Sequence, residues 1–260
     1  MIDFHTHILP NIDDGSKSVE ETFNLIKEAK KVGFNEIIST SHYIEKYYET
    51  DEAERKVWID AIENGLKADN IEVKLYVGSE IYFSENIMAL LRGHKASTIS
   101  GTNYVLFELA LNAKPLNLYD VVYEMLGYKL VPILAHPERY SFVQNDPSLI
   151  YDLVQKGVLM QLNYGSILGL YGTRAQIIAR KLLENNMVHF LGSDVHKQNS
   201  IYPKVPEAIK EIKKIIGQEK TYELTTLNAK NVLKNKTIEI ETVKEIQLSM
   251  KEKLGMKMKK

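Results

Sequence analysis

The chain has 260 residues, of which 44% are hydrophobic and 26% charged, and its formal net charge is -1. This composition is typical of a globular protein with a substantial core, and the near-neutral charge does not favour binding to nucleic acid or to membrane surfaces. The chain contains no cysteine, which excludes disulfides, thiolate metal sites and cysteine nucleophiles. Apolar runs fall far short of the roughly eighteen residues of a membrane span. The N-terminus lacks the basic region and long apolar core of a signal peptide. We therefore expect a cytoplasmic protein that is not an integral membrane protein.

Short apolar runs rich in β-branched and aromatic residues alternate with amphipathic segments along the chain. The amphipathic segments predict helices, the first of which begins with a capping box at Ser18 and stops at Gly33. Further helices are expected at 51–68, 117–126, 146–156, 173–184 and 206–216. The apolar runs predict seven buried strands, at 2–7, 36–42, 73–83, 104–109, 130–136, 158–163 and 188–194.

Regular alternation of strands and helices with short connections predicts parallel βα units, and seven such units favour a barrel over two domains. We expect one α/β domain over residues 1–236, a distorted (βα)7 TIM-like barrel. We expect residues 237–260 to form a Lys-rich C-terminal helix or tail. This tail is typical of a solvated helix, and the alternative is a basic arm that contacts an acidic partner or anionic lipid.

Polar residues with metal-ligand chemistry follow strand after strand at the carboxyl end, where parallel βα folds place their active sites. His5 and His7 lie two residues apart and so point to the same side of the first strand. The loop that follows adds Asp14, with Asp13 as the adjacent alternative. A buried imidazole or carboxylate at an apolar strand end is costly unless it is paired or metal-bound. The candidate metal ligands are His5, His7, Asp14, His42, Glu80, Glu108, His136, Asp194 and His196.

Two other histidines do not fit this pattern. His94 lies in a basic loop, and His189 lies at the start of its strand and hence at the opposite end of the barrel. We interpret both as structural or surface residues. The sixth strand lacks a candidate ligand, although it ends in the polar pair Gln161 and Asn163.

At these residues the sequence resembles the polymerase and histidinol phosphatase (PHP) superfamily. It is more narrowly similar to the bacterial manganese-dependent protein tyrosine phosphatases of capsule and exopolysaccharide operons. The segments that carry this resemblance are 13–15 (Asp-Asp-Gly), 107–109 (Phe-Glu-Leu), 135–140 (Ala-His-Pro-Glu-Arg-Tyr), 165–169 (Gly-Ser-Ile-Leu-Gly) and 193–196 (Ser-Asp-x-His). The resemblance implies the PHP fold and a trinuclear metal site.

The resemblance also implies how nine ligands would serve three ions. One ion would be held by His5, His7, Glu80 and Asp194. Glu80 would bridge to a second ion, which Glu108 and His136 share. The third ion would be held by Asp14, His42 and His196. Mn²⁺ is favoured by analogy, whereas the ligand types alone also allow Fe²⁺, Zn²⁺ or Mg²⁺.

The resemblance assigns Arg139 to the phosphoryl group of the substrate, and we place Arg139, His42, His136 and Asp194 among the catalytic residues. A second arginine often found in the family is replaced here by Ile201. Lys197 or Lys204 would supply that charge as a point cation rather than a fork. On the active-site side, Tyr43 is a candidate substrate contact.

The expected chemistry is hydrolysis of a phosphate monoester by metal-activated hydroxide, without a covalent enzyme intermediate. Four carboxylates (-4) and three divalent ions (+6) leave +2, which suits a phosphate dianion. The leading hypothesis is dephosphorylation of a phosphotyrosine protein, a membrane-associated tyrosine kinase of capsule synthesis. Alternatives are a histidinol-phosphate or other small-molecule phosphatase, and a nucleic-acid phosphoesterase or binding module, which the net charge disfavours.

Overall fold

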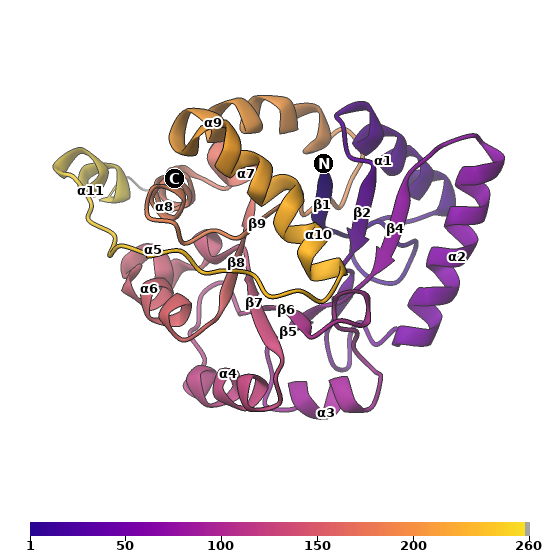
Figure 1. Cartoon of the computed structure of the whole chain (residues 1–260), viewed down its shortest axis with the longest axis horizontal. Coiled ribbons are helices and arrows are strands. Elements are labelled where there is room, and N and C mark those ends of the chain that lie inside the picture. The colour runs from indigo at the N-terminus through magenta and orange to yellow at the C-terminus, as the bar shows by residue number, and fades with distance from the viewer. Residues whose placement is uncertain (258–260) are drawn as a thin grey trace.

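The computed structural model describes residues 1–257, and its strands form a curled parallel arrangement of two sheets (Figure 1). The first sheet has the order β1-β2-β4 and the second the order β3-β5-β6-β7-β8-β9, with every pairing parallel. The strands are β1 (Ile2–Thr6), β2 (Glu36–Ser39), β3 (His42–Tyr43), β4 (Lys74–Val77), β5 (Glu80–Tyr82), β6 (Tyr104–Glu108), β7 (Val131–Ala135), β8 (Leu159–Asn163) and β9 (Phe190–Gly192).

The last strand returns to the first and closes the ring. The backbone N–H of Asp194 donates to the carbonyl of His5 over 2.8 Å, and Thr6 forms a parallel bridge with Val195. At the other junction, residues 40–41 connect β2 to β3 and residues 78–79 connect β4 to β5. The expected distorted (βα)7 TIM-like barrel of the PHP type is confirmed.

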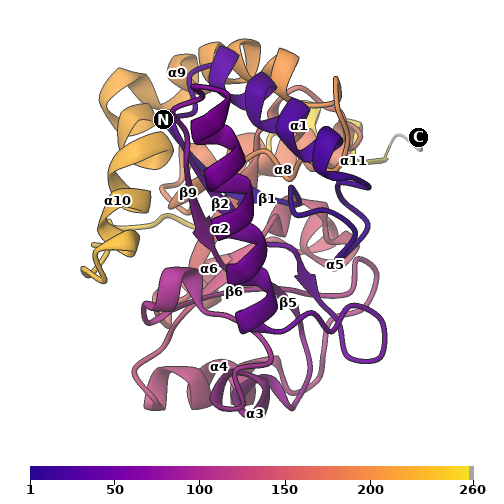
Figure 2. The ribbon, with the colours of Figure 1, turned by 90° about the vertical axis from the view of Figure 1, so that its right-hand side faces the viewer.

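Helices surround the strands and one closes the amino-terminal end of the barrel. Ala229 and Val232 of α10 join the interior cluster that contains Phe4, Leu106 and Phe190. Figure 2 shows α10 on one side of the molecule and α5 on the other. The helices are α1 (Val19–Lys31), α2 (Glu52–Ala68), α3 (Ile87–Arg92), α4 (Leu118–Gly127), α5 (Ser141–Asn145), α6 (Ser148–Gln155), α7 (Tyr164–Ile167), α8 (Thr173–Glu184), α9 (Val205–Tyr222), α10 (Asn228–Leu233) and α11 (Met250–Lys257).

Helix ends follow local signals in the sequence. The Ser18 hydroxyl accepts from the backbone N–H of Glu21, while the Glu21 carboxylate accepts from the N–H of Lys17. These bonds satisfy donors that a helix start leaves free. The helix expected at 206–216 is present, but α9 runs on to Tyr222 through a non-helical Gly217 with φ 80°. Glycine tolerates that left-handed backbone.

Two strands predicted as continuous are each divided in the structure. Segment 36–42 breaks between β2 and β3, and segment 73–83 breaks at Gly78 between β4 and β5. Arg55 of α2 fills this break and is fully buried. Its guanidinium donates to the carbonyls of Ser41 (2.7 Å), His42 (2.8 Å) and Gly78 (3.4 Å), and its Nε donates to Thr50 (2.9 Å). Arg55 therefore satisfies the carbonyls that interrupted strand pairing leaves free.

Replacing Arg55 with Met is expected to destabilise the protein, because these buried carbonyls would lose their donors. Unsatisfied buried acceptors cost about 1–3 kcal/mol each, and the carbonyls of Ser41 and Gly78 are the fully buried pair, so we expect a loss of roughly 2–6 kcal/mol in the free energy of unfolding. Urea denaturation measures it. Lys56→Met, an exposed change on the same helix, is the control. Equal stability of the two variants would contradict the role given to Arg55.

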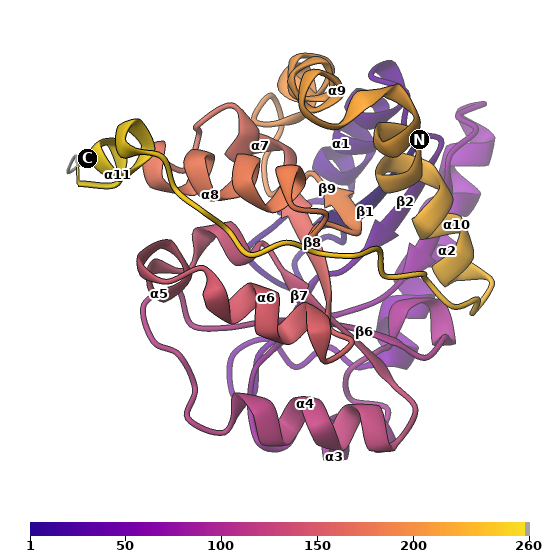
Figure 3. The ribbon, with the colours of Figure 1, turned by 60° about the vertical axis from the view of Figure 1, so that its left-hand side comes forward.

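The C-terminal segment lies along the barrel rather than away from it (Figure 3). The side chains of Ile238 and Val243 are buried in the two core clusters. Within α11, Glu252 pairs with Lys181 of α8 at 3.0 Å. The expected helix in this segment is present, and Lys259 and Lys260 of the basic tail lie outside the described residues. Among residues 1–257, no helix combines the length and apolar character that crossing a membrane requires.

Candidate metal centre

The barrel brings all nine predicted ligands to its carboxyl-terminal mouth. His5 lies within β1 and His7 just after it, and His136 directly follows β7. Asp194 and His196 follow β9, whereas Asp14 comes from the loop between β1 and α1. The remaining ligands are positioned by the strands themselves: His42 begins β3, Glu80 begins β5 and Glu108 ends β6.

Glu80 lies at the centre of the group and is fully buried. Its two carboxylate oxygens face imidazole nitrogens of four histidines. From Oε2 the distances are 3.2 Å to His5 Nε2, 3.4 Å to His7 Nε2 and 3.0 Å to His42 Nδ1, and from Oε1 the distance is 2.9 Å to His136 Nε2. Glu108 Oε1 lies 3.1 Å from His42 Nδ1. One buried carboxylate thus connects predicted ligands from four strand ends, those of β1, β3, β5 and β7.

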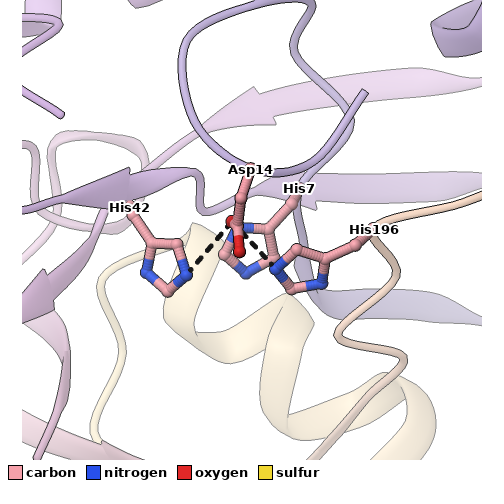
Figure 4. Close-up of side chains that lie close together, drawn as sticks. All are labelled: His7, Asp14, His42 and His196. Carbon is pink, nitrogen blue, oxygen red and sulfur yellow. Dashed lines mark ion pairs between the residues drawn. The ribbon is translucent and has the colours of Figure 1, made fainter. Parts of the chain in front are cut away.

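A second cluster lies at the more exposed side of the mouth (Figure 4). Asp14 Oδ1 is 3.2 Å from His196 Nε2 and 3.6 Å from His42 Nε2. The rings of His7 and His196 stack with their centroids 4.0 Å apart. Three sets of donor atoms therefore have the proximity that a metal ion needs: His7, Asp14, His42 and His196; His5, His7 and Glu80; His42, Glu80 and Glu108.

Asp13 and Asp14 have different surroundings. Asp13 Oδ2 accepts hydrogen bonds from His7 Nδ1 (2.8 Å) and from the backbone N–H of His42 (2.9 Å). Its Oδ1 accepts from the N–H of Gly15 at 2.9 Å. With Nδ1 bound to Asp13, His7 presents Nε2 to the cluster, which is how carboxylates orient metal-binding histidines. The geometry therefore favours Asp14 as a ligand and Asp13 as the residue that orients His7.

Asp194 connects the cluster to Arg139. Its Oδ1 is 3.4 Å from His7 Nε2 and 3.7 Å from His5 Nε2. Its Oδ2 accepts from Arg139 Nη1 at 2.8 Å. The Arg139 guanidinium also lies over the ring of Tyr171, 4.6 Å from its centroid. Arg139 is thereby held at the edge of the metal-ligand cluster.

Two of the predicted ligands have a left-handed backbone conformation. His136 has φ 34° and Asp194 has φ 53°, although neither is a glycine. Non-glycine residues in this region cost about 1–3 kcal/mol each and persist where the surrounding structure enforces them. His136 directly follows β7 and Asp194 lies two residues after β9, so in both cases the chain turns sharply at the mouth of the barrel.

The donor set fits divalent metal ions. Among the described residues, His42 Nδ1, Glu80 Oε2 and His136 Nδ1 are buried without a hydrogen-bond partner. The first two lie only 3.0 Å apart. Unsatisfied buried polar atoms are rare in native proteins and call for an ion or another unplaced partner. Nitrogen and oxygen donors suit Mn²⁺, Fe²⁺, Zn²⁺ and Mg²⁺ to different degrees, and thiolates are absent.

The electrostatics of the cluster agree with this fit. Burial raises the pKa of Glu80, but His5 and His42 lower it more, so its pKa lies well below the usual range. Burial likewise opposes ionisation of Asp194, and nearby histidines, His5 first, hold its pKa well below normal. Burial lowers the pKa of His42, yet Glu80 and Glu108 raise it to about 10. Glu80 and Asp194 are therefore ionised at neutral pH, as metal ligands must be, whereas an ion that binds His42 would have to displace its proton.

The predicted substrate contacts occupy two kinds of position. Lys197 and Lys204 line a pocket of about 470 Å³ beside Asp194 and His196, and Tyr171 and Ile201 form part of its wall. Tyr43, in contrast, is only 3% exposed and packs in the main core. Tyr48, in the loop that follows β3, faces the predicted ligands instead. Its ring stacks on His42 with the centroids 6.2 Å apart.

Sequence reasoning overlooked several residues around the site. The burial of Arg55 could not be recognised from the sequence, because a lysine or arginine on an amphipathic helix is usually solvated. Glu138 lies beside Arg139 but is fully buried, and its Oε1 accepts from Ser166 Oγ and from the N–H of Asn163. Tyr171 is one of 15 tyrosines in the sequence, and no local pattern distinguishes it from the others. Only their long-range partners identify these residues.

His94 and His189 lie outside the cluster, as expected. His94 is exposed and pairs with Glu52 at 3.1 Å. His189 is buried, and its Nδ1 accepts from the backbone N–H of Met160 at 3.1 Å. Burial, assisted by Lys220, lowers the pKa of His189 from 6.5 to about 3. His189 is therefore a neutral structural histidine.

This shift predicts an acid-sensitive contribution to stability. Between pH 6.5 and 3 the unfolded chain binds a proton at His189 that the folded protein does not, so stability falls as pH falls. From pH 7 to pH 5 the loss from this group is about 2 kcal/mol. His189→Asn, which retains an acceptor for Met160, should lose correspondingly less stability over that range in urea denaturation. A constant difference between the two proteins at all pH values would contradict this.

Comparison with known proteins adds family evidence to this geometry. The family model for capsular polysaccharide synthesis, CpsB/CapC, matches residues 1–234. Tyrosine-protein phosphatase YwqE of Bacillus subtilis is 31% identical over 238 residues, covering 92% of this chain and 93% of YwqE. Tyrosine-protein phosphatase CpsB of Streptococcus agalactiae is 29% identical over 240 residues, covering 90% of this chain and 99% of that protein.

The backbone gives the same result. A crystal structure from the study of YwqE from B. subtilis and CpsB from Streptococcus pneumoniae superposes with a TM-score of 0.90 at 29% identity. The match covers 95% of this chain and 100% of the other. Those proteins are described as unique metal-dependent tyrosine phosphatases.

Proposed function

The chain belongs to the CpsB/CapC family of capsular polysaccharide synthesis, and we propose that it is a metal-dependent protein-tyrosine phosphatase that works with three divalent ions. The observation that carries this proposal is the convergence of nine histidine and carboxylate side chains, with buried Glu80 at their centre and Arg139 at their edge. The relatives named as tyrosine-protein phosphatases align along almost the whole chain, so the entire barrel corresponds to theirs.

We propose the distribution of ligands implied by the sequence. His5, His7, Glu80 and Asp194 hold one ion, and Glu80 bridges to a second held with Glu108 and His136. Asp14, His42 and His196 hold the third. Three sets of close donor atoms support three positions, although proximity alone groups His42 with Glu80 and Glu108. Mn²⁺ is the metal we favour.

When bound, the ions would activate water for attack on phosphorus and neutralise charge on the phosphoryl oxygens. The chain's own residues bind and orient the substrate. Arg139 has a guanidinium pre-positioned by Asp194 and Tyr171, and its remaining N–H groups suit two phosphoryl oxygens at once. His42, His136 and Asp194 act as catalytic ligands. The absence of cysteine fits a reaction without a phosphocysteine intermediate.

A protein-bound substrate suits the shape of the mouth. The side chain of Asp14 is 54% exposed, so the outer cluster is accessible. Loops on this side carry exposed apolar residues, with Tyr47 81% and Leu111 43% exposed. Such residues could contact the chain on either side of a phosphotyrosine. We propose a membrane-associated tyrosine kinase of capsule synthesis as the partner, met in the cytoplasm.

The experiment that tests the function compares two substrates on metal-loaded protein. We expect kcat/KM for a phosphotyrosine peptide to exceed that for histidinol phosphate, with activity lost on chelation and restored by Mn²⁺. Elemental analysis should give about three metal ions per chain. A clear preference for histidinol phosphate, or full activity without metal, would refute the proposal.

Lys197 and Lys204 are the candidates for the second phosphate contact, since Ile201 is buried in the wall of the same pocket. We expect Lys197→Ala or Lys204→Ala to raise KM for a phosphotyrosine peptide about tenfold, the effect of one charged contact. Metal content should stay unchanged. Lys210→Ala, an exposed change on α9, is the control. Unchanged KM in both pocket variants would remove this assignment.

A further inference from the structure

Strand β8 carries no predicted ligand, yet its two polar side chains lie in the metal-ligand cluster. Gln161 and Asn163 are both fully buried. Gln161 Oε1 lies 2.7 Å from His5 Nδ1, and Gln161 Nε2 donates to Asn163 Oδ1 at 2.9 Å. Asn163 Nδ2 then donates to Asp194 Oδ2 at 2.7 Å. A chain of hydrogen bonds therefore joins His5 to Asp194 through β8.

The donor and acceptor roles in this series of hydrogen bonds are determined by Asp194, its charged end. An ionised Asp194 can only accept, so Asn163 must present its NH₂ group to it and its oxygen to Gln161. Gln161 must then donate through Nε2 and present its oxygen to His5. His5 consequently carries its proton on Nδ1, which leaves the lone pair of Nε2 facing Glu80 at 3.2 Å.

Two further contacts hold Gln161 in this orientation. The backbone N–H of His136 donates to the same Oε1 at 3.4 Å, which requires an oxygen at that position. A Cβ atom on Gly192 would lie 2.7 Å from Gln161 Nε2 and 2.6 Å from the Cβ of His5. These distances are far below van der Waals contact, so only glycine at 192 leaves room for the amide beside His5.

At the Asp194 end of this series of hydrogen bonds, the aspartate also contacts Arg139. Asn163 and Arg139 both donate to Asp194 Oδ2, at 2.7 Å and 2.8 Å, and Oδ1 is left to face His5 and His7. The backbone of Asn163 is in turn bound to Glu138, the neighbour of Arg139 in sequence. Strand β8 thus orients His5 through Gln161, and it orients Asp194 with its partner Arg139 through Asn163.

We propose that Gln161 and Asn163 are positioning residues of the metal centre, which fix the Nδ1–H form of His5 and assign one oxygen of Asp194 to the metal side and the other to Arg139. This inference rests on the metal-dependent function proposed above. Partners of this kind typically contribute 10- to 100-fold in metal affinity or activity, because they preorganise the ligand.

The test uses Gln161→Met, which keeps the length of the side chain but removes both hydrogen-bonding groups. Competition with a chelator should show that Zn²⁺ or Mn²⁺ binds about 10- to 100-fold more weakly than in the wild type. In the Zn²⁺-loaded protein, the NMR signal of the His5 Nδ1 proton, shifted downfield by its bond to Gln161, should be lost. Gln218→Met, at an exposed position, is the matched control.

A second variant separates positioning from folding. Gln161→Glu still accepts from His5 Nδ1 but can no longer donate to Asn163. It should retain the downfield His5 proton and bind metal more tightly than Gln161→Met, while KM for a phosphotyrosine peptide rises because Asp194 and Arg139 lose their support. Wild-type metal affinity together with an unchanged His5 signal in Gln161→Met would overturn the inference. If the wild-type protein itself binds no metal, the proposed function is refuted instead.

Discussion

Replacing Glu80 with Gln is expected to abolish phosphatase activity and to reduce the metal content. The carboxylate lies within 3.4 Å of nitrogen atoms from four histidines, and the neutral amide would direct an N–H₂ group toward them. Metal ions contribute several kcal/mol to phosphoryl transfer, so we expect kcat/KM to fall by about a thousandfold or more. Steady-state kinetics and elemental analysis of the purified variant measure both effects.

Glu124→Gln on α4 is the matched control, since it makes the same chemical change at an exposed position. Circular dichroism should show that both variants keep their secondary structure, because barrel pairing involves backbone groups rather than this carboxylate. A Glu80 variant with normal metal content and normal kcat/KM would show that the buried cluster is not the catalytic centre.

Replacing Arg139 with Ala should impair catalysis while leaving the metal content intact. The guanidinium is held by Asp194 and Tyr171 at the edge of the cluster, where we propose that it binds the phosphoryl group rather than an ion. Losing one such preorganised donor costs about 3–4 kcal/mol in comparable sites, so kcat/KM should fall roughly 100- to 1,000-fold. Arg139→Lys should recover only part of the loss, because an ammonium lacks the bidentate fork.

The control for this change is Arg180→Ala, which removes a partly exposed guanidinium paired with Glu211 at 3.5 Å. Metal per chain, measured beside the kinetics, distinguishes a substrate contact from damage to the centre. Unchanged kcat/KM in Arg139→Ala would remove the assigned role, and a loss of metal would make Arg139 a support for Asp194 instead.

The two variants separate the functions that meet at Asp194. Its Oδ1 faces the histidines and its Oδ2 faces Arg139. Asp194, which has a positive φ, presents the carboxylate in this position two residues after β9. Asp194 therefore links the predicted metal ligands to the proposed phosphoryl-binding arginine, and β8 supports the same carboxylate oxygen through Asn163.

Most of the fold, and the convergence of the candidate ligands, could be predicted from the sequence, because both depend on local patterns. Apolar periodicity identifies strands and helices, and parallel βα units place every strand end at one mouth. Histidines and carboxylates at those ends therefore had to converge, and the absence of cysteine restricted the donors to nitrogen and oxygen. The chain order alone was enough to assign His94 and His189 to other parts of the molecule.

Only the tertiary structure decided which of these groups meet. Gln161 and His5 are 156 residues apart, and nothing near either residue indicates the other. The breaks in segments 36–42 and 73–83 likewise could not be predicted, because they depend on Arg55 of α2, which lies outside both segments. The different surroundings of Asp13 and Asp14 also became apparent only in the structure. A sequence pattern specifies which face of its own element a side chain occupies. Closure of the barrel specifies its partner, because contacts between distant strands depend on the register and twist of every strand between them.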